Sequence, residues 1–371
     1  MVTCTDLAVL CGNHPDICYA KYNAQALKKG ARHEAAVRIV LASIQAAALR
    51  YGRCIKPLVA LQIDFYLRVF VVVEDSKLEC KAAAPKVAVQ YQCEQCESYH
   101  LQPMGKQTRE GAHPQFWPAT AAPFQSPCIH CGGDILVGGP LYCSDLGQKD
   151  VLDRLLEALS EEAKRTAGDA PGVGKKGYAY GLASVPRLRA LLGGLRSELD
   201  VPGLDGAMSM SLKDMCQSMG MSSVPTGRVY NALEKKGYKV SHSHTDSQCI
   251  KSDAPLAVLW DMMRCLKRQQ EDAADRIGEG KPTKEKKQKK KKKDHAYPEL
   301  IGKEPIVTDW DFSQEAHRLC AKTRKHNVQE GEVYAPLFPP NPEKGWGPKK
   351  AASSHRFERE EAERKSKKPK A

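Results

Sequence analysis

The sequence predicts an α/β segment followed by a C-terminal α+β domain, which contains a zinc module and a winged-helix-like part, and then a disordered basic tail. Three observations predict this fold class. A helical apolar pattern over residues 32–50 precedes β-branched and aromatic residues over 58–73. Two cysteine pairs lie among glycines and prolines in residues 87–143. Two short helix patterns and a β-ribbon pattern then occupy residues 211–251.

The N-terminal residues predict the end of a larger sheet. Val2-Thr-Cys-Thr-Asp6 has the pattern of a buried strand, and a lone strand has no partners. Residues 58–63 and 65–73 predict either one long strand or two joined strands. The helix between them carries apolar residues at helical spacing on one face: Val37, Val40, Leu41, Ile44 and Ala48.

The composition argues against membrane-spanning and secreted proteins. The most apolar run, residues 57–73, contains Asp64 and Arg68, so no stretch could span a bilayer. The N-terminus lacks the charged-then-apolar layout of a signal peptide. The 14 cysteines are therefore expected in a reducing compartment, where close pairs indicate a metal site rather than disulfides. We predict an intracellular protein without a membrane partner.

The two cysteine pairs predict a structural zinc site. Cys93-Glu-Gln-Cys96 and Cys128-Ile-His-Cys131 are CxxC turns separated by 31 residues. Each turn presents two sulfurs toward one point, and zinc binds four thiolates in a tetrahedron that leaves no open position for a substrate. The alternative is a set of unrelated buried thiols or a redox pair. His100, His130 and Cys143 are the nearby substitutes for any one ligand.

The region between the zinc module and the winged-helix-like part predicts two helices, at residues 150–164 and 185–199, joined by a Gly-rich loop. The loop does not fit a phosphate loop, because five residues separate Gly168 from Gly174 and Lys176 stands where Ser or Thr is required. No catalytic triad, paired-carboxylate site or dinucleotide-binding glycine motif occurs. The sequence thus assigns no catalytic residue.

Residues 211–251 predict two helices and a β-ribbon. Ser211 is the expected N-cap of a helix ending near Met219, and a second helix is expected from 222 to 236, before Gly237. Strands over 238–241 and 249–251 follow, and one more helix covers 254–268. Arg228, Lys235 and Lys236 are candidate nucleic-acid contacts on the second helix; the alternative is a winged helix that only packs.

The C-terminal tail holds most of the net charge of +13. Residues 281–371 contain 24 Lys and Arg and 14 Asp and Glu, which leaves +3 for residues 1–280. The lysine block at 286–293 predicts disorder, a polyanionic partner and nuclear localisation, with the cytoplasm or mitochondrion as alternatives. Aromatic residues recur around Trp310 and Trp346.

Taken together, the motifs resemble the tRNA guanine dimethyltransferases, and the match covers most of residues 1–270. Both cysteine pairs agree with the family pattern. The other matching stretches are Val2-Thr-Cys-Thr-Asp6, Lys21-Tyr22, His33-Glu34, Arg38-Ile-Val-Leu41, Asp64-Phe-Tyr66, Arg68-Val-Phe70, Gly138-Gly-Pro140, Ile250-Lys-Ser-Asp-Ala-Pro255, Trp260-Asp261, Arg264-Cys265, Asn341-Pro-Glu and Trp346-Gly-Pro348. Asn23 and Arg32 depart from it, since the family favours Gly and Cys there.

The resemblance implies transfer of two methyl groups from S-adenosylmethionine to the amine of guanine 26 in tRNA. It also implies that residues 1–85 are the end of a Rossmann-type methyltransferase domain. In the family, the cofactor-binding strands and a catalytic Asp-Pro-aromatic-Gly motif precede the Val2-Thr-Cys-Thr-Asp6 strand. We therefore expect the C-terminal two-thirds of such an enzyme, which binds tRNA but neither binds the cofactor nor methylates alone.

The predicted organisation is a methyltransferase remnant over residues 1–85, a zinc-binding module over 86–150, a tRNA-binding α+β domain over 151–275 and a basic tail over 276–371. Two other functions remain open: a non-catalytic RNA-binding protein of the same family, and a DNA-binding regulator with a zinc ribbon and a winged helix. The oligomeric state is not predicted. The predicted RNA contacts are Lys21, Arg32, Arg228, Lys235, Lys236 and Lys251.

Overall fold

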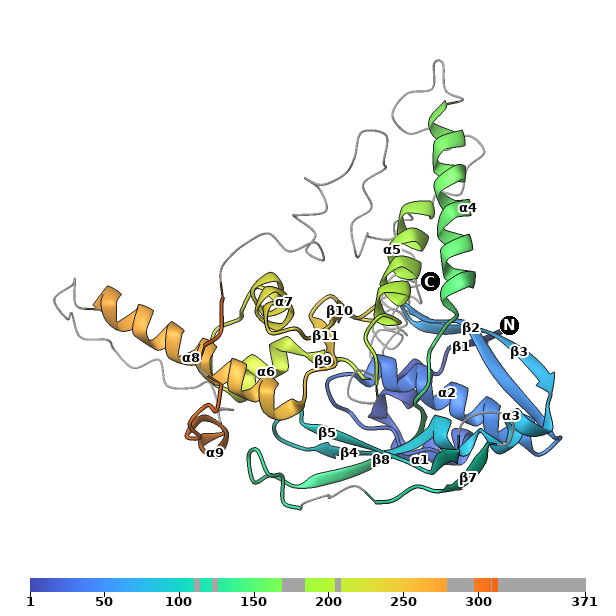
Figure 1. Cartoon of the computed structure of the whole chain (residues 1–371), viewed down its shortest axis with the longest axis horizontal. Helices are drawn as coiled ribbons and strands as arrows, with labels where there is room; N and C mark the ends of the chain where they lie inside the picture. Colours follow the sequence, from blue (N-terminus) through green and yellow to red (C-terminus); the bar gives the residue numbers. More distant parts are fainter. Residues whose placement is uncertain are drawn as a thin grey trace, which may run out of the picture. The chain divides into compact units, whose positions relative to one another are not determined.

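Helix α2 (Arg32–Leu49) packs against two different sheets in the N-terminal part of the structure (Figure 1). The structure is a computed structural model, and it describes residues 1–109, 114–121, 126–168, 184–203, 208–278, 297–307 and 309–312. Alanine and leucine favour the helix, and small side chains permit close approach to its neighbours. Gly52, with φ of 69°, turns the chain into the next strand. The helix confirms the prediction for residues 32–50.

The first sheet has the strand order β1-β3-β2, and both strand pairs are antiparallel. Its strands are β1 (Val2–Cys4), β2 (Arg53–Ile63) and β3 (Tyr66–Asp75). Between β2 and β3, Asp64 adopts a φ of 50° in a tight turn, so the predicted apolar stretch forms two strands rather than one. Helix α1 (Pro15–Tyr22) and the π-helical turn Val9–Asn13 connect β1 to α2.

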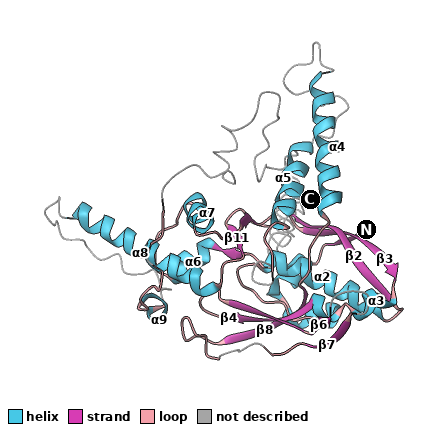
Figure 2. Cartoon of the chain, in the orientation of Figure 1, coloured by secondary structure: helices cyan, strands magenta, loops and turns pink. Residues whose placement is uncertain are grey.

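The second sheet has the order β5-β4-β8 and contains both cysteine pairs at its ends. Its strands are β4 (Val87–Cys93), β5 (Tyr99–Pro103) and β8 (Ile135–Tyr142). A separate ribbon, β6 (Gly105–Arg109) with β7 (Gln115–Pro118), follows β5 (Figure 2). Helix α3 (Lys77–Lys81) and a 3₁₀ turn at Ala84–Lys86 link the two sheets. The guanidinium of Arg38 on α2 donates to the Tyr142 carbonyl at 2.7 Å, which ties α2 to the end of β8.

The C-terminal elements closely follow the predicted order. Helices α4 (Lys149–Gly168) and α5 (Val185–Glu198) pair with each other. A small sheet of order β10-β11-β9 follows; two helices lie between β9 and β10 in the chain, and a third follows β11. The bounds are β9 (Met210–Ser211), α6 (Leu212–Ser218), α7 (Thr226–Lys235), β10 (Val240–His242), β11 (Cys249–Ser252) and α8 (Leu256–Gly278).

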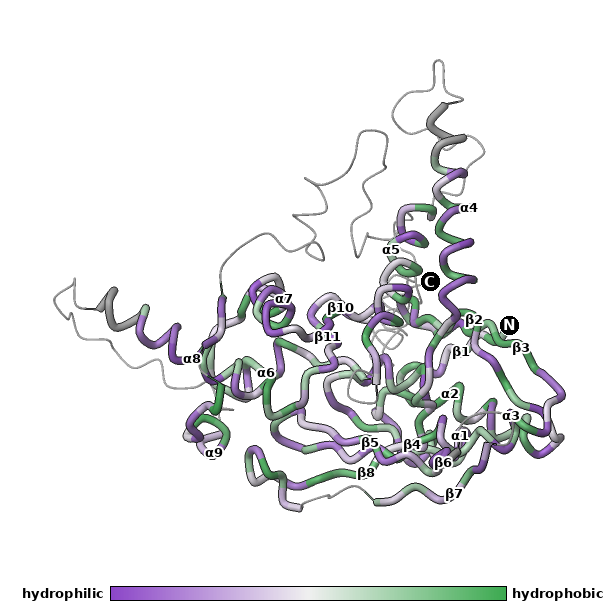
Figure 3. Tube along the Cα trace, viewed as in Figure 1, coloured by the Kyte–Doolittle hydropathy of each residue, from purple (hydrophilic) through white to green (hydrophobic). Residues whose placement is uncertain are grey.

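Three helix ends differ from the predictions by four residues or more, and one of them is the end of α4, which lies at Gly168 rather than at Lys164. Helix α7 begins after Pro225 rather than at Ser222, because a residue that precedes proline disfavours the helical conformation. Helix α8 continues well beyond Arg268, and the turn that follows Arg268, residues 269–272, is hydrophilic (Figure 3). A hydrophilic turn needs no apolar partner. The helix therefore continues after the apolar pattern that predicted it has ended.

Part of the predicted tail is ordered against the preceding helices. Helix α9 (Pro298–Ile301) buries Leu300, and Trp310 and Phe312 are also buried. The aromatic residues explain the difference, since they supply apolar area that a lysine-rich tail lacks. The described residues all belong to one compact unit, and the predicted division at 85, 150 and 275 stays a prediction.

Several predicted features lie outside the described residues: most of the Gly-rich loop, the lysine block and the region of Trp346. Predictions about them remain predictions, including nuclear localisation. Among the described helices, none has the length and apolar character needed to cross a bilayer.

Candidate metal centre and nucleic-acid interface

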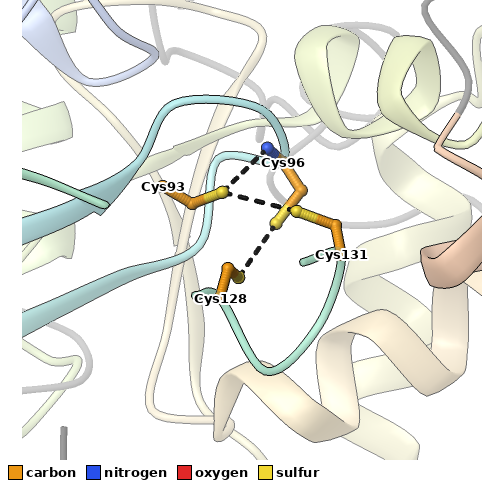
Figure 4. A group of neighbouring side chains, drawn as sticks. All are labelled: Cys93, Cys96, Cys128 and Cys131. Atoms are coloured by element: carbon orange, nitrogen blue, oxygen red, sulfur yellow. Dashed lines mark hydrogen bonds between the residues drawn. The ribbon is translucent and has the colours of Figure 1, made fainter. Parts of the chain in front are cut away.

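The four predicted zinc ligands converge on one point (Figure 4). All four sulfurs lie within 4.8 Å of one another, with Cys93 Sγ 3.4 Å from Cys131 Sγ and Cys96 Sγ 3.7 Å from Cys128 Sγ. Four sulfurs around a zinc ion at about 2.3 Å stand roughly 3.8 Å apart. The spacing therefore suits a tetrahedral Cys₄ ion, and among the described residues no other group of metal-binding side chains meets the same condition.

The backbone of each CxxC turn supports the sulfurs. The amides of Gln95 and Cys96 donate to Cys93 Sγ, each at 3.4 Å, and such bonds favour the thiolate that a metal requires. Glu97 (φ of 54°) and Gly132 (φ of 74°) reverse the chain after each pair. The Cys93 amide then donates to the Ser98 carbonyl at 2.8 Å, which closes the first turn.

The cluster is buried and linked to helix α8. All four cysteines are buried, and Cys96 Sγ lies 3.1 Å from Ser98 Oγ, which accepts a hydrogen bond from Trp260 Nε1 at 2.8 Å. The suggested substitutes His100, His130 and Cys143 are not members of the four-sulfur group. A site that is closed by four thiolates and buried suits a structural ion rather than a catalytic one.

Lys251, a predicted RNA contact, is instead buried in an ion network, so that prediction is wrong. It is 3% exposed, and its Nζ lies 2.7 Å from Glu34 Oε1 and 2.9 Å from Glu198 Oε2. Glu198 also contacts His244 Nδ1 at 2.7 Å, and Arg38 pairs with Glu34 at 2.8 Å. Sequence pattern missed this role because Lys251 lies in a short polar strand whose burial depends on α2 and α5.

The network holds its carboxylates in the charged form. Burial raises the pKa of Glu34, but the charges of Lys251 and Arg38 outweigh burial and hold that pKa below its usual range. Burial acts in the same way on Glu198, where His244 and Lys251 hold the pKa well below its usual range. A buried ion network of this kind is costly unless every member is paired, so it fixes how its elements pack.

Lys21 and Arg32 are exposed, as a surface contact requires. Lys21 Nζ lies 2.8 Å from Asp6 Oδ2, and Tyr22 Oη donates to the same carboxylate at 3.1 Å. The hydrogen bond from Lys21, partly opposed by burial, holds the Asp6 pKa below its usual range. This arrangement joins α1 to the segment after β1. Lys21 therefore already has one ion-pair partner within the protein.

The three basic residues of α7 share one partner segment. Arg228 donates to the Phe312 carbonyl, Lys235 pairs with Asp311, and Lys236, which caps the C-terminal end of α7, pairs with Asp309. Sequence pattern brought the three cations together on one helix but could not show that an acidic and aromatic segment covers them. The aromatic region around Trp310 was the available signal.

Comparison with known proteins identifies the family. The family model for N2,N2-dimethylguanosine tRNA methyltransferases matches residues 1–264. The chain belongs to this family. Its members include a tRNA (guanine(26)-N(2))-dimethyltransferase 2 of Arabidopsis thaliana, 31% identical over 94% of this chain and 52% of that protein. The Homo sapiens tRNA (guanine(26)-N(2))-dimethyltransferase is 31% identical over 95% of this chain and 47% of that protein. The chain thus spans about half the length of these curated relatives.

A solved family structure shares the fold. The structure of Trm1 from Pyrococcus horikoshii with S-adenosyl-L-methionine aligns with a TM-score of 0.52 and 21% identity, over 68% of this chain and 56% of that one. The mixed α/β architecture is therefore confirmed. In the described part of this chain every neighbouring strand pair is antiparallel. No cofactor contact is assigned to the described residues.

Proposed function

We propose that this protein takes part in the dimethylation of guanine 26 in tRNA, with S-adenosylmethionine as methyl donor. The observation that carries the proposal is the family match over residues 1–264. The relatives named above are dimethyltransferases of that base, and the family structure was solved with the methyl donor. We infer the methyltransferase activity and the tRNA partner of this chain from those relatives.

The described residues are proposed to supply structure and tRNA contacts. The guanine amine is a weak nucleophile, because its lone pair is delocalised into the ring, so transfer requires in-line placement and a group that accepts the amine proton. We assign that acceptor to none of the described residues. Their part is to hold the substrate and to support the sheet that contains β1.

The cysteine cluster is proposed to bind one structural zinc ion. Cys93, Cys96, Cys128 and Cys131 join the β4–β5 turn to the segment that leads into β8. The sulfur spacing and the amide donors support zinc, and the absence of a fifth ligand group in the cluster supports a structural role.

Helices α6 and α7 with β9, β10 and β11 are proposed to form a winged-helix-like unit. Their order, strand–helix–helix–strand–strand, and the antiparallel ribbon support this assignment. On it, Arg228, Lys235 and Lys236 are the proposed phosphate contacts, and Lys21 and Arg32 are proposed contacts on the other elements. Lys251 is not among them.

Two measurements test the proposal. Binding of an unmodified tRNA transcript should exceed binding of duplex DNA of equal length at the same salt concentration, and equal affinities would favour a DNA-binding regulator.

The second measurement is transfer of a labelled methyl group. It is made with this chain alone and with this chain mixed with the portion of a relative that the chain does not match. Transfer to the guanine-26 transcript but not to an adenine-26 control supports the proposal; no transfer in either arm contradicts it.

A further inference from the structure

Four residues after α9 reproduce, within the chain, the chemistry of a single-stranded nucleic acid. We call Asp309, Trp310, Asp311 and Phe312 the latch. Lys236 Nζ lies 2.5 Å from Asp309 Oδ1, and Lys235 Nζ lies 2.7 Å from Asp311 Oδ2. Carboxylates thus stand against α7 where phosphate groups of a bound RNA would stand.

The aromatic members of the latch face the same cations. Lys236 Nζ is 5.7 Å from the centre of the Trp310 ring, and Arg228 Cζ is 5.8 Å from that of Phe312. The two rings stack at 6.3 Å with an interplanar angle of 20°. An unpaired RNA segment likewise offers a protein stacked rings flanked by anions, which Lys and Arg side chains contact.

The segment before the latch is anchored to helix α8 by hydrogen bonds of its own. The carbonyl of the buried Leu300 accepts from Arg264 Nε at 3.0 Å, and the Ile306 amide donates to Asp261 Oδ2 at 3.1 Å. In contrast, the side chain of Asp309 is 81% exposed. Exposed ion pairs contribute only about 0.2–1 kcal/mol each. Trp310 and Phe312 are buried, so displacement of the latch also has to replace their contacts, and bases that stack at the same place would do so.

We propose that the latch is an internal competitor of RNA, which occupies the α7 surface formed by Arg228, Lys235 and Lys236 until a tRNA displaces it. The inference rests on the proposed tRNA binding by α7. Competition would favour long, highly charged RNA over short fragments, because only a ligand that makes several contacts at once replaces both ion pairs and both ring contacts. An RNA therefore has to make several contacts at once before it can bind α7.

The test compares tRNA affinity among three single substitutions that each remove one negative charge. Asp309→Asn and Asp311→Asn should each tighten binding of an unmodified tRNA transcript about twofold to fivefold, the equivalent of one exposed ion pair. Glu304→Gln is the matched control: Glu304 is 83% exposed and pairs at 2.5 Å with Arg268 on α8, not with Arg228, Lys235 or Lys236. It should leave the affinity unchanged. Equal tightening by all three would show a general charge effect and overturn the proposal.

Lys235→Gln with Lys236→Gln separates this inference from the proposed function. If α7 binds RNA under the latch, the pair of substitutions weakens binding and abolishes the gain from Asp311→Asn. If the pair weakens binding but neither Asp substitution strengthens it, α7 binds RNA and the latch is only structural. If the pair changes nothing in either background, both proposals fail for α7. Hydrogen exchange gives an independent readout: amides 309–312 should lose protection at saturating tRNA, and unchanged protection contradicts displacement.

Discussion

Ser98 connects the cysteine cluster to the C-terminal helices through a single hydroxyl. Its Oγ accepts from Trp260 Nε1 at 2.8 Å and lies 3.1 Å from Cys96 Sγ. Trp260 is buried on α8. Tyr99, which follows Ser98 in the chain, donates its hydroxyl to the Met208 carbonyl at 2.9 Å. Loss of the metal would therefore loosen α8 and the segment before β9 as well as the cysteine turns.

Replacement of one thiol should remove the metal and unfold this region. Cys128→Ser leaves three thiolates, and binding of zinc to a Cys₄ site is itself folding free energy, of order 10 kcal/mol in small domains. We expect about one zinc per wild-type chain and little in the variant, by metal analysis of the purified protein. Cys143→Ser is the control, since Cys143 lies in the same module outside the four-sulfur group. Unchanged zinc in Cys128→Ser would contradict the assignment.

Removal of the buried lysine charge should be far more costly than removal of an exposed one. Lys251→Met leaves Glu34 and Glu198 close together without their shared cation, and breaking a buried ion pair costs about 3–5 kcal/mol. Lys239→Met, an exposed position just before β10, should change the free energy of unfolding by less than about 0.5 kcal/mol. Chemical denaturation measures both. Similar losses would show that Lys251 does not hold the two carboxylates.

Three elements distant in the chain meet at that network. Glu34 comes from α2, Glu198 from α5 and Lys251 from β11. The second carboxylate oxygen of Glu34 accepts from the Ser209 amide at 3.0 Å, just before β9. Each element supplies part of the neutralising charge, so none can shift without leaving a buried charge unpaired. The network therefore couples α2 to α5 and to the small sheet that contains β9 and β11.

The network should make stability sensitive to acid. The folded-state pKa values of Glu34 and Glu198 lie below their usual range, whereas the unfolded values are about 4.3. Their contribution is fully present above the unfolded pKa and is lost as the pH falls toward the folded values, because the unfolded state binds protons first. Denaturation between about pH 7 and 3 should show a steep loss below about pH 4.5.

A neutral variant checks the source of that acid sensitivity. Glu198→Gln should be less stable at neutral pH, and its free energy of unfolding should fall less steeply below pH 4.5 than that of the wild type. Glu157→Gln, at an exposed position on α4, should keep the wild-type slope. If the Glu198 variant also kept the wild-type slope, protonation of this network would not govern acid unfolding.

At the scale of the whole molecule, positive charge is concentrated at the C-terminal end. Residues 281–371 hold +10 of the net +13, with seven lysines in 286–293. Phosphate contacts by such residues release counterions and add affinity that does not depend on sequence. This contribution is distinct from that of α7, whose cations have fixed partners.

Replacement of the seven lysines of the block by glutamine should weaken binding to all RNAs alike. The slope of log affinity against log salt should become shallower by several units, since each lost phosphate contact removes roughly 0.7–0.9. These substitutions leave the latch residues 309–312 unchanged in sequence. Replacement by arginine keeps the charge and should preserve the slope. A loss confined to one tRNA would mean that the block reads a specific structure.

Local sequence patterns predicted several elements well. Ser211 caps α6 as expected, with its Oγ accepting from the Asp214 amide at 3.2 Å, and Gly237 follows α7 with φ of 86°. These features depend on residues a few positions apart, so local chemistry is sufficient. The convergence of the four cysteine sulfurs was predictable for a similar reason, because the CxxC spacing itself fixes the geometry of each turn.

The sequence by itself determined the cluster of four cysteines, the order of helices and strands, and the family. Only the tertiary structure decided that Lys251 is buried between two carboxylates rather than exposed to RNA, and that residues 309–312 cover the basic side of α7. The physical reason is distance along the chain. The charge state and accessibility of a side chain depend on which remote segments pack against it, and Lys251 gains its partners from residues more than 50 and 200 positions away.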